Sequence, residues 1–287
     1  MSVTNYPALH RKPTGAYPSP RHKLAAASPH VIGANVPSSF AVVPPVLQMW
    51  GNDTYGDCVS AEEAASKAMW SVMAGLPELL IPDNVLIQWA RQNGFLNGAN
   101  LTDVMDAMIS VGITVNGVTY KDGPYNSVDW TNDAVLSSAI FTGPIKIGIA
   151  ANQLQGVVGS SNGWFATGFR NDNNEDHSVA LWGFGTVAEC FGFLNVAPPS
   201  GANLTERAYL LFTWNTIGVI DQPSLLAICG EAWLRNPTTP SQVPPTPTPV
   251  PPTPVPPNPV PPTPVPPNPS PTPVTYTMAG TFTGTIS

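Results

Sequence analysis

One proline-rich stretch limits where this 287-residue chain can build a core. From Pro237 to Val274 the sequence is almost only Pro, Thr, Val, Asn and Ser, and PPTPVPPNPV at 251–260 is repeated as PPTPVPPNPS at 261–270. Such a segment lacks ladder donors and large apolar side chains, so it predicts a polyproline II linker over 236–274. The folded part must therefore come from the residues before it.

A short alternating segment follows the linker. TYTMAGTFTGTIS at 275–287 alternates Thr with Tyr, Met, Phe and Ile, which predicts a β-strand or one hairpin. A single hairpin is marginally stable at best in water. We therefore expect 275–287 to anchor or assemble the protein by pairing with its own domain, another copy or a partner strand.

Charge is distributed unevenly along the sequence. Residues 1–52 carry four basic residues and no acid, residues 53–235 carry all 18 acids and seven bases, and no charged side chain follows Arg235. We expect 1–35 to be an irregular basic arm, because it is rich in proline and lacks periodicity. The acidic body has no basic stripe with aromatics, so we expect no nucleic-acid partner.

The N-terminus, the charged fraction and the cysteines indicate in which cellular or extracellular compartment the protein acts. The N-terminus lacks the apolar region of a signal peptide, and no apolar run is long enough to predict a membrane span. Only 10% of the residues are charged, which favours an extracellular or virion-associated protein. For Cys58, Cys190 and Cys229 we expect three reduced thiols, with a Cys190–Cys229 disulfide as the alternative.

Helix patterns come first in the body and strand patterns second. Apolar spacing and stop signals predict helices over 58–75, 83–94, 101–112 and 131–143. Alternation predicts strands over 144–151, 177–187, 190–197 and 208–215, while 224–234 fits either structure and 36–43 is extended. This segregated order predicts an α+β fold with two lobes over 36–235.

Three residues could form a thiol-based catalytic site. Cys58 begins the first predicted helix, where peptide dipoles lower a thiol pKa. His177 is the one histidine at the start of a predicted strand, and Asn215 ends the strand 208–215, where it could orient the imidazole. The alternative is that Cys58 is a small apolar residue at the start of a buried helix. The adjacent Asp57 favours that alternative, because a carboxylate raises a thiol pKa.

Four segments resemble the papain-like cysteine peptidases. DHSVALWGFG at 176–185 is similar to the histidine box of that family, and YLLFTWNTIG at 209–218 is similar to its asparagine box. GPIKIGIAA at 143–151 resembles the strand before the histidine, and VPSSFAV at 36–42 resembles the strand that starts the mature enzyme. The resemblance covers about 36–235 and implies a papain-like fold.

The resemblance also implies roles for individual residues. Cys58 would be the nucleophile, His177 its base and Asn215 the group that holds the ring. Asn52 would stand where the family has its oxyanion-hole glutamine, six residues before the cysteine. Val59 and Ile217 depart from the family, which has tryptophan at both positions.

No cofactor and no metal are expected. Four acids surround the start of the first predicted helix, and we expect them to be a solvated face and helix-terminal charges rather than ligands: Asp53, Asp57, Glu62 and Glu63. We also expect no helical inhibitory propeptide within residues 1–35, because they are too few for one.

Two function hypotheses follow. The first is a papain-like thiol hydrolase that cleaves peptide or peptidoglycan-type amide bonds and is displayed or anchored by the proline-rich stalk. The second is a non-catalytic structural or attachment protein of a virion or extracellular filament, which keeps the fold and assembles through 275–287. The departures from the family leave the choice between enzyme and scaffold open.

Overall fold

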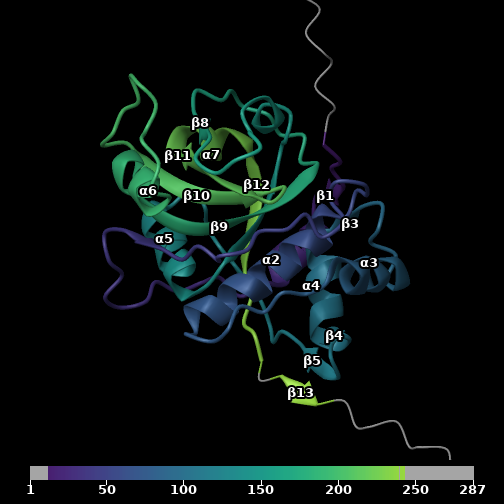
Figure 1. Ribbon diagram of the computed structural model, residues 1–287. Coiled ribbons are helices and arrows are strands. Elements are labelled where there is room, and N and C mark those ends of the chain that lie inside the picture. The colour runs from purple at the N-terminus through teal and green to yellow at the C-terminus, as the bar shows by residue number, and fades with distance from the viewer. Residues whose placement is uncertain (1–11, 239, 243–287) are drawn as a thin grey trace, which may run out of the picture. The chain divides into compact units, whose positions relative to one another are not determined.

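The computed structural model describes residues 12–238 and 240–242 (Figure 1). They belong to one compact unit, Met1–Pro244, and the second unit of the chain is Pro245–Ser287. The rest of the predicted linker and the predicted strand 275–287 lie outside the described residues and stay predictions. In the described part, no helix is both long and apolar enough to cross a membrane.

Helix α2 (Cys58–Met73) is the centre of the helical lobe. Its first twelve residues are all buried, and many are Ala or Ser, so the small side chains let other elements approach it on every side. The other elements of this lobe are α3 (Asp83–Gln92), α4 (Leu101–Ser110), β4 (Ile113–Val115) and β5 (Val118–Tyr120). The predicted helices at 58–75, 83–94 and 101–112 are thereby confirmed.

An eight-stranded, mostly antiparallel sheet forms the second lobe. The strand order is β6-β12-β7-β9-β10-β11-β8, and β2 pairs with β9 outside that path. The strands are β2 (Phe40–Ala41), β6 (Asn126–Ser127), β7 (Ile145–Ile149), β8 (Phe165–Ala166), β9 (His177–Thr186), β10 (Arg207–Thr213), β11 (Thr216–Asp221) and β12 (Cys229–Leu234). The sheet lies on one side of α2, with α3 and α4 on the other (Figure 1). This segregated arrangement confirms the α+β expectation.

Three helices and one short turn of 3₁₀ helix pack on the sheet lobe. They are α5 (Asp133–Thr142), η1 (Leu154–Gly156), α6 (Val187–Phe193) and α7 (Gln222–Ile228). The prediction of a strand over 190–197 is wrong. Thr186 and Glu189 form a capping box, in which each side chain bonds the backbone N–H of the other, and this box starts α6. The ambiguous segment 224–234 contains both structures, since α7 leads directly into β12.

The N-terminal arm and the start of the proline-rich segment both lie on the body. The arm contains β1 (Ala16–Tyr17), which pairs in parallel with β3 (Ala99–Asn100), and helix α1 (Arg21–Ala26). At the other end, β13 (Ser241–Gln242) pairs with β5. Regular structure therefore occurs within 12–35, where an irregular arm is expected, and residues 241–242 pair with the body, where the linker is expected.

A buried ion network fixes α2 against the sheet. Lys146 Nζ of β7 lies 2.5 Å from Glu62 and 3.0 Å from Glu63, and Arg235 Nη1 lies 2.7 Å from Glu62. All four side chains are about fully buried. The expectation that Glu62 and Glu63 form a solvated face is wrong, because two buried cations neutralise them. The network therefore holds the first turns of α2 in place.

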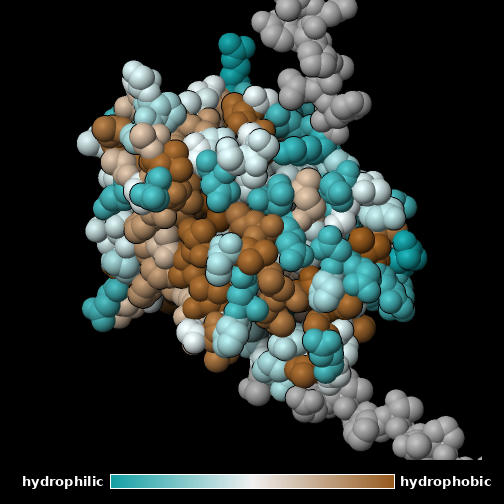
Figure 2. Space-filling view, viewed as in Figure 1, coloured by the Kyte–Doolittle hydropathy of each residue, from teal (hydrophilic) through white to brown (hydrophobic). Residues whose placement is uncertain are grey.

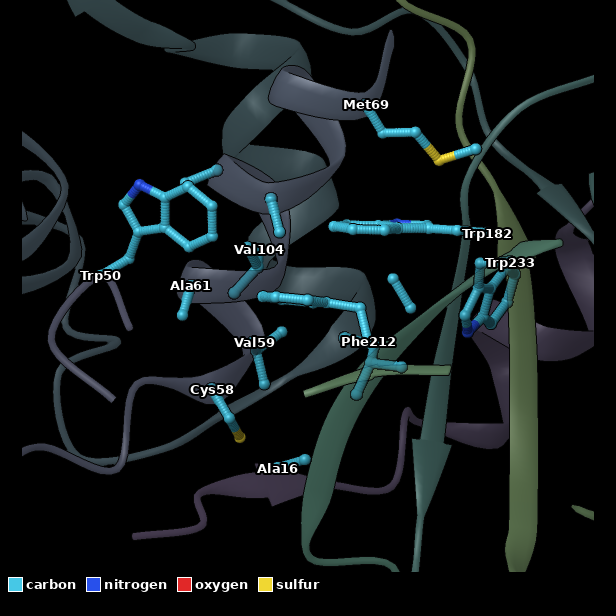
Figure 3. Packing of buried hydrophobic residues seen from close by; sticks show 14 of the residues in the cluster. Ala16, Trp50, Cys58, Val59, Ala61, Met69, Val104, Trp182, Phe212 and Trp233 are labelled. Atoms are coloured by element: carbon cyan, nitrogen blue, oxygen red, sulfur yellow. The ribbon is translucent and has the colours of Figure 1, made fainter. Parts of the chain in front are cut away.

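Apolar packing adds to this attachment. Trp182 of β9 stacks on Phe212 of β10 with ring centroids 4.5 Å apart, and Figure 3 shows both rings facing α2. Apolar side chains also gather in the middle of the face seen in Figure 2, over α2 and β9. The helix start is thus positioned by both charge and packing. All three cysteines are free, so no disulfide contributes.

Candidate active site

Cys58 is the first residue of α2 and is 1% exposed. Burial raises the pKa of its thiol to about 12, although backbone N–H groups of Ser178 and Gly15 and the charge of Lys146 act in the opposite direction. Asp57 is also buried, and burial raises the pKa of this carboxyl to about 7. Cys58 is therefore a protonated thiol in this state.

His177 is the first residue of β9 and is equally buried. Its Nε2 lies 2.8 Å from Thr213 Oγ1, and its ring stacks on Trp214 with centroids 4.1 Å apart and planes 14° apart. Its Nδ1 has no hydrogen-bond partner among the described residues. Burial, and then the charge of Lys12, lowers the pKa of the imidazole to about 3. The ring is therefore neutral and held from two sides.

Cys58 and the groups that hold His177 surround one small cavity. Its volume is about 10 Å³, which is room for one water at most. The residues that line it are Gln48, Met49, Asn52, Cys58, Ala61, Glu62, Ser178, Phe212, Thr213 and Trp214. The fold thus brings the start of α2, the start of β9 and the end of β10 to one cavity.

Asn215 lies outside this arrangement. It is exposed and forms, with Trp214, the two-residue turn between Thr213 of β10 and Thr216 of β11. Trp214 and Asn215 both have positive φ, 43° and 60°, as a tight hairpin turn of this hand requires. The structure differs here from the expected His177–Asn215 hydrogen bond, and Thr213 is the partner of the ring instead.

Asn52 lines the cavity, but its amide is engaged. Its Nδ2 donates to the carbonyl oxygens of Tyr55, at 3.1 Å, and Pro13, at 3.4 Å. The side chain is buried and lines the same cavity as Cys58. In this state, the amide nitrogen of Asn52 is therefore already hydrogen-bonded to two backbone carbonyl oxygens.

The segment Lys12–Tyr17, here called the N-terminal strap, contacts residues that surround the cavity. The N–H groups of Gly15 and Ala16 donate to the carbonyl oxygen of Asp176, at 2.9 and 3.0 Å, and Trp214 Nε1 donates to Pro13, at 3.2 Å. Figure 3 shows the Cys58 thiol pointing from the start of α2 toward Ala16. No periodicity or motif in the sequence signals this contact.

Several solved structures that match the fold of this chain are cysteine proteases. No protein-family profile and no curated protein sequence matches the chain. Xylellain, a cysteine protease from Xylella fastidiosa, aligns with a TM-score of 0.55 and 12% identity over 79% of this chain and 96% of its own. Digestive procathepsin L 3 from Tenebrio molitor aligns with a TM-score of 0.54 and 15% identity, over 79% of this chain and 76% of its own.

Bromelain from Ananas comosus gives a similar result, with a TM-score of 0.51 and 12% identity over 70% of this chain and 99% of its own. The described residues therefore adopt the papain-like fold, and the resemblance inferred from the sequence motifs is confirmed at the level of the fold. At these identities the likeness concerns the fold alone.

Proposed function

We propose that the protein is a papain-like thiol hydrolase of amide bonds, with Cys58 as nucleophile and His177 as base. The observation that carries the proposal is the state of the imidazole. Its Nε2 and its face are held by Thr213 and Trp214, while its buried Nδ1 is unpaired among the described residues. A buried structural histidine normally has both nitrogens satisfied, so the free nitrogen calls for a functional explanation.

The proposal implies the following steps. With hydrogen on Nε2, Thr213 Oγ1 accepts from the ring, and the lone pair of Nδ1 is left to take the proton of the Cys58 thiol. The thiolate attacks the carbonyl carbon of the amide, and the proton then passes from Nδ1 to the leaving nitrogen. Water hydrolyses the resulting thioester, giving its proton to Nδ1 and regenerating the thiol.

Two groups are placed to stabilise the oxyanion. The N–H groups of Ser60 and Ala61 donate to the carbonyl of Asp57, whereas the N–H of Cys58 precedes the first of these bonds and is the nearest to the thiol. The amide of Asn52 lines the same cavity and becomes available once it releases Pro13. We propose peptide or peptidoglycan-type amides as substrates, presented to an enzyme that the proline-rich stalk displays outside a cell or on a virion.

The rival proposal is a structural or attachment protein that keeps the fold without catalysis. The observation that favours it is the burial of Cys58 and His177, each 1% exposed. Under this proposal the stalk and residues 275–287 would carry the function by assembly, and the thiol would be inert.

Thiol labelling tests the proposal directly. The full chain is treated with low iodoacetamide at pH 6, and Cys58 is compared with Cys190 and Cys229 by peptide mass spectrometry. Under the enzyme proposal Cys58 reacts fastest, and the His177→Ala variant loses that advantage because the thiolate is no longer supported. Equal Cys58 rates in both proteins, together with no Cys58-dependent cleavage of labelled casein or peptidoglycan, would favour the scaffold.

A further inference from the structure

We propose that the small cavity beside Cys58 binds one water molecule, which the hydroxyl of Ser178 holds in place so that it stabilises the thiolate by a hydrogen bond. Ser178 is then a further positioning residue of the proposed hydrolase. This role rests on the function proposed above and deepens it, because it explains how a buried thiol can carry a charge.

Ser178 places a hydroxyl on an apolar face of β9. Side chains alternate along a strand, so Ser178 shares its face with Ala180 and Trp182. Both belong to the buried apolar cluster that contains Cys58. Ser178 is 3% exposed, and its Oγ has no hydrogen-bond partner among the described residues. A buried hydroxyl without a partner is costly, which predicts a polar ligand at this position.

The cavity provides the room for that ligand. Ser178 and Cys58 both line it, and no hydrogen bond joins Ser178 Oγ to the thiol. Its volume of about 10 Å³ suits one water molecule and is too small for an organic ligand. A buried water needs roughly two to four polar partners, and Gln48 and Asn52, which carry side-chain amides, line the same cavity. A water there bridges the hydroxyl and the sulfur.

The charges around the cavity favour a neutral occupant. Among the residues that the structure describes, Glu62 is the one charged side chain that lines it. Lys146 and Arg235 approach this carboxylate at 2.5 and 2.7 Å, so its charge is already neutralised. The occupant is therefore water rather than a metal ion or an anion.

The bound water acts on the charge of Cys58. Burial is the first cause that raises the pKa of this thiol, and the backbone N–H of Ser178 acts in the opposite direction. Of the charges that face the thiol, Asp57 raises its pKa and Lys146 lowers it. The water accepts from the hydroxyl of Ser178 and donates to the sulfur, while the proton of the thiol still passes to His177. Ser178 therefore acts through the water and does not replace the base.

The test uses the full chain, with Ser178→Ala as the variant that loses the hydroxyl and Ser60→Ala as the matched control. Ser60 lies in the first turn of α2 and is fully buried. Its hydroxyl also has no partner among the described residues, but Ser60 does not line the cavity.

The rate of Cys58 alkylation by iodoacetamide measures the thiolate. We expect labelling at pH 6 to be about tenfold slower in Ser178→Ala, because a hydrogen bond to a charged group is lost. The whole labelling profile should move to higher pH by about one unit, which a purely structural change would not produce. The rate and the profile of Ser60→Ala should equal those of the wild type.

A second measurement detects the water itself and needs no variant. Water-selective NOE spectroscopy on the ¹⁵N-labelled wild type should show a cross-peak between a bound water and the amide proton of Cys58. A wild-type spectrum without this cross-peak overturns the inference.

The remaining outcomes separate the water site from the proposed function. Equal Cys58 profiles in Ser178→Ala and the wild type overturn the inference, and so do equal losses in Ser178→Ala and Ser60→Ala, which would assign the effect to packing around α2. A loss confined to Ser178→Ala supports the water site. If His177→Ala then leaves the labelling unchanged and the wild type cleaves no labelled casein or peptidoglycan, the water site stands and the proposed hydrolase is overturned.

Discussion

His177 Nε2 lies 2.8 Å from Thr213 Oγ1, so the first residue of β9 is held by the last residue of β10. The two strands are hydrogen-bonded neighbours in the sheet, with Phe212 opposite Ala180. The hydroxyl therefore sits on a rigid strand end rather than on a loop. This placement makes Thr213 the positioning residue for the ring under the proposed mechanism.

Thr213→Val should remove that support and keep the shape of the side chain. A buried hydrogen bond that loses one partner costs about 1–3 kcal/mol, so we expect Cys58 labelling at pH 6 to slow by roughly 10- to 100-fold. Thr213→Ser should retain most of the rate. Asn215→Ala is the matched control at the exposed turn, and a loss there equal to that of Thr213→Val would contradict the assignment.

Lys146→Met should lower the free energy of unfolding by about 3–5 kcal/mol. The substitution leaves Glu62 and Glu63 in the interior with Arg235 as their remaining close cation, and an uncompensated buried charge is costly. Urea unfolding measures the change. Arg91→Met, at an exposed position of α3, is the control, and similar losses in the two variants would show that the network contributes little.

Glu175→Gln should make the protein less sensitive to alkaline pH. Burial, and then the neighbouring Glu231, raises the pKa of Glu175 to about 9. A raised pKa contributes stability that is present below the ordinary value of about 4.5 and is lost as the pH rises through about 9. The melting temperature of the wild type should therefore fall between pH 5 and 9 by more than that of the variant.

Asp103→Asn, at an exposed site of α4, is the comparison for this titration. It should follow the wild-type pH profile. If Glu175→Gln gave the same profile as well, the carboxyl would not be protonated in the folded protein.

Thr186→Ala should destabilise the protein by about 1 kcal/mol, because it removes the capping box of α6. Thermal unfolding gives the difference. Thr205→Ala, in the exposed loop before β10, should have little effect. Equal stabilities of Thr186→Ala and the wild type would mean that packing alone holds the helix.

Much of the fold follows from local patterns in the sequence. The helices at 58–75, 83–94 and 101–112 have strong apolar spacing and glycine stops, and the order of the motifs places Cys58 near His177. The apolar residues of 190–197 fit a strand, but the capping box of Thr186 and Glu189 starts a helix just before them. In such a short segment, local hydrogen bonds determine whether a helix or a strand forms, and apolar content does not.

The site itself was harder to predict, and the reason is geometrical. The asparagine-box resemblance aligned Asn215 with the family residue, but a two-residue turn after Thr213 shifts the register and turns Asn215 out to solvent. Residues 12–17 have no periodicity, and their hydrogen bonds to Asn52, Asp176 and Trp214 are made by backbone groups. Contacts made through N–H and C=O groups do not depend on the side chain, so the sequence pattern does not indicate them.

The carbonyl oxygen of Pro13 accepts hydrogen bonds from Asn52 Nδ2 and from Trp214 Nε1. Asn52 belongs to the segment that leads into α2, and Trp214 belongs to the turn between β10 and β11. One backbone atom of the strap therefore couples the start of the helical lobe to the sheet lobe. A shift of either element would disturb both bonds, so we expect the two elements to move together.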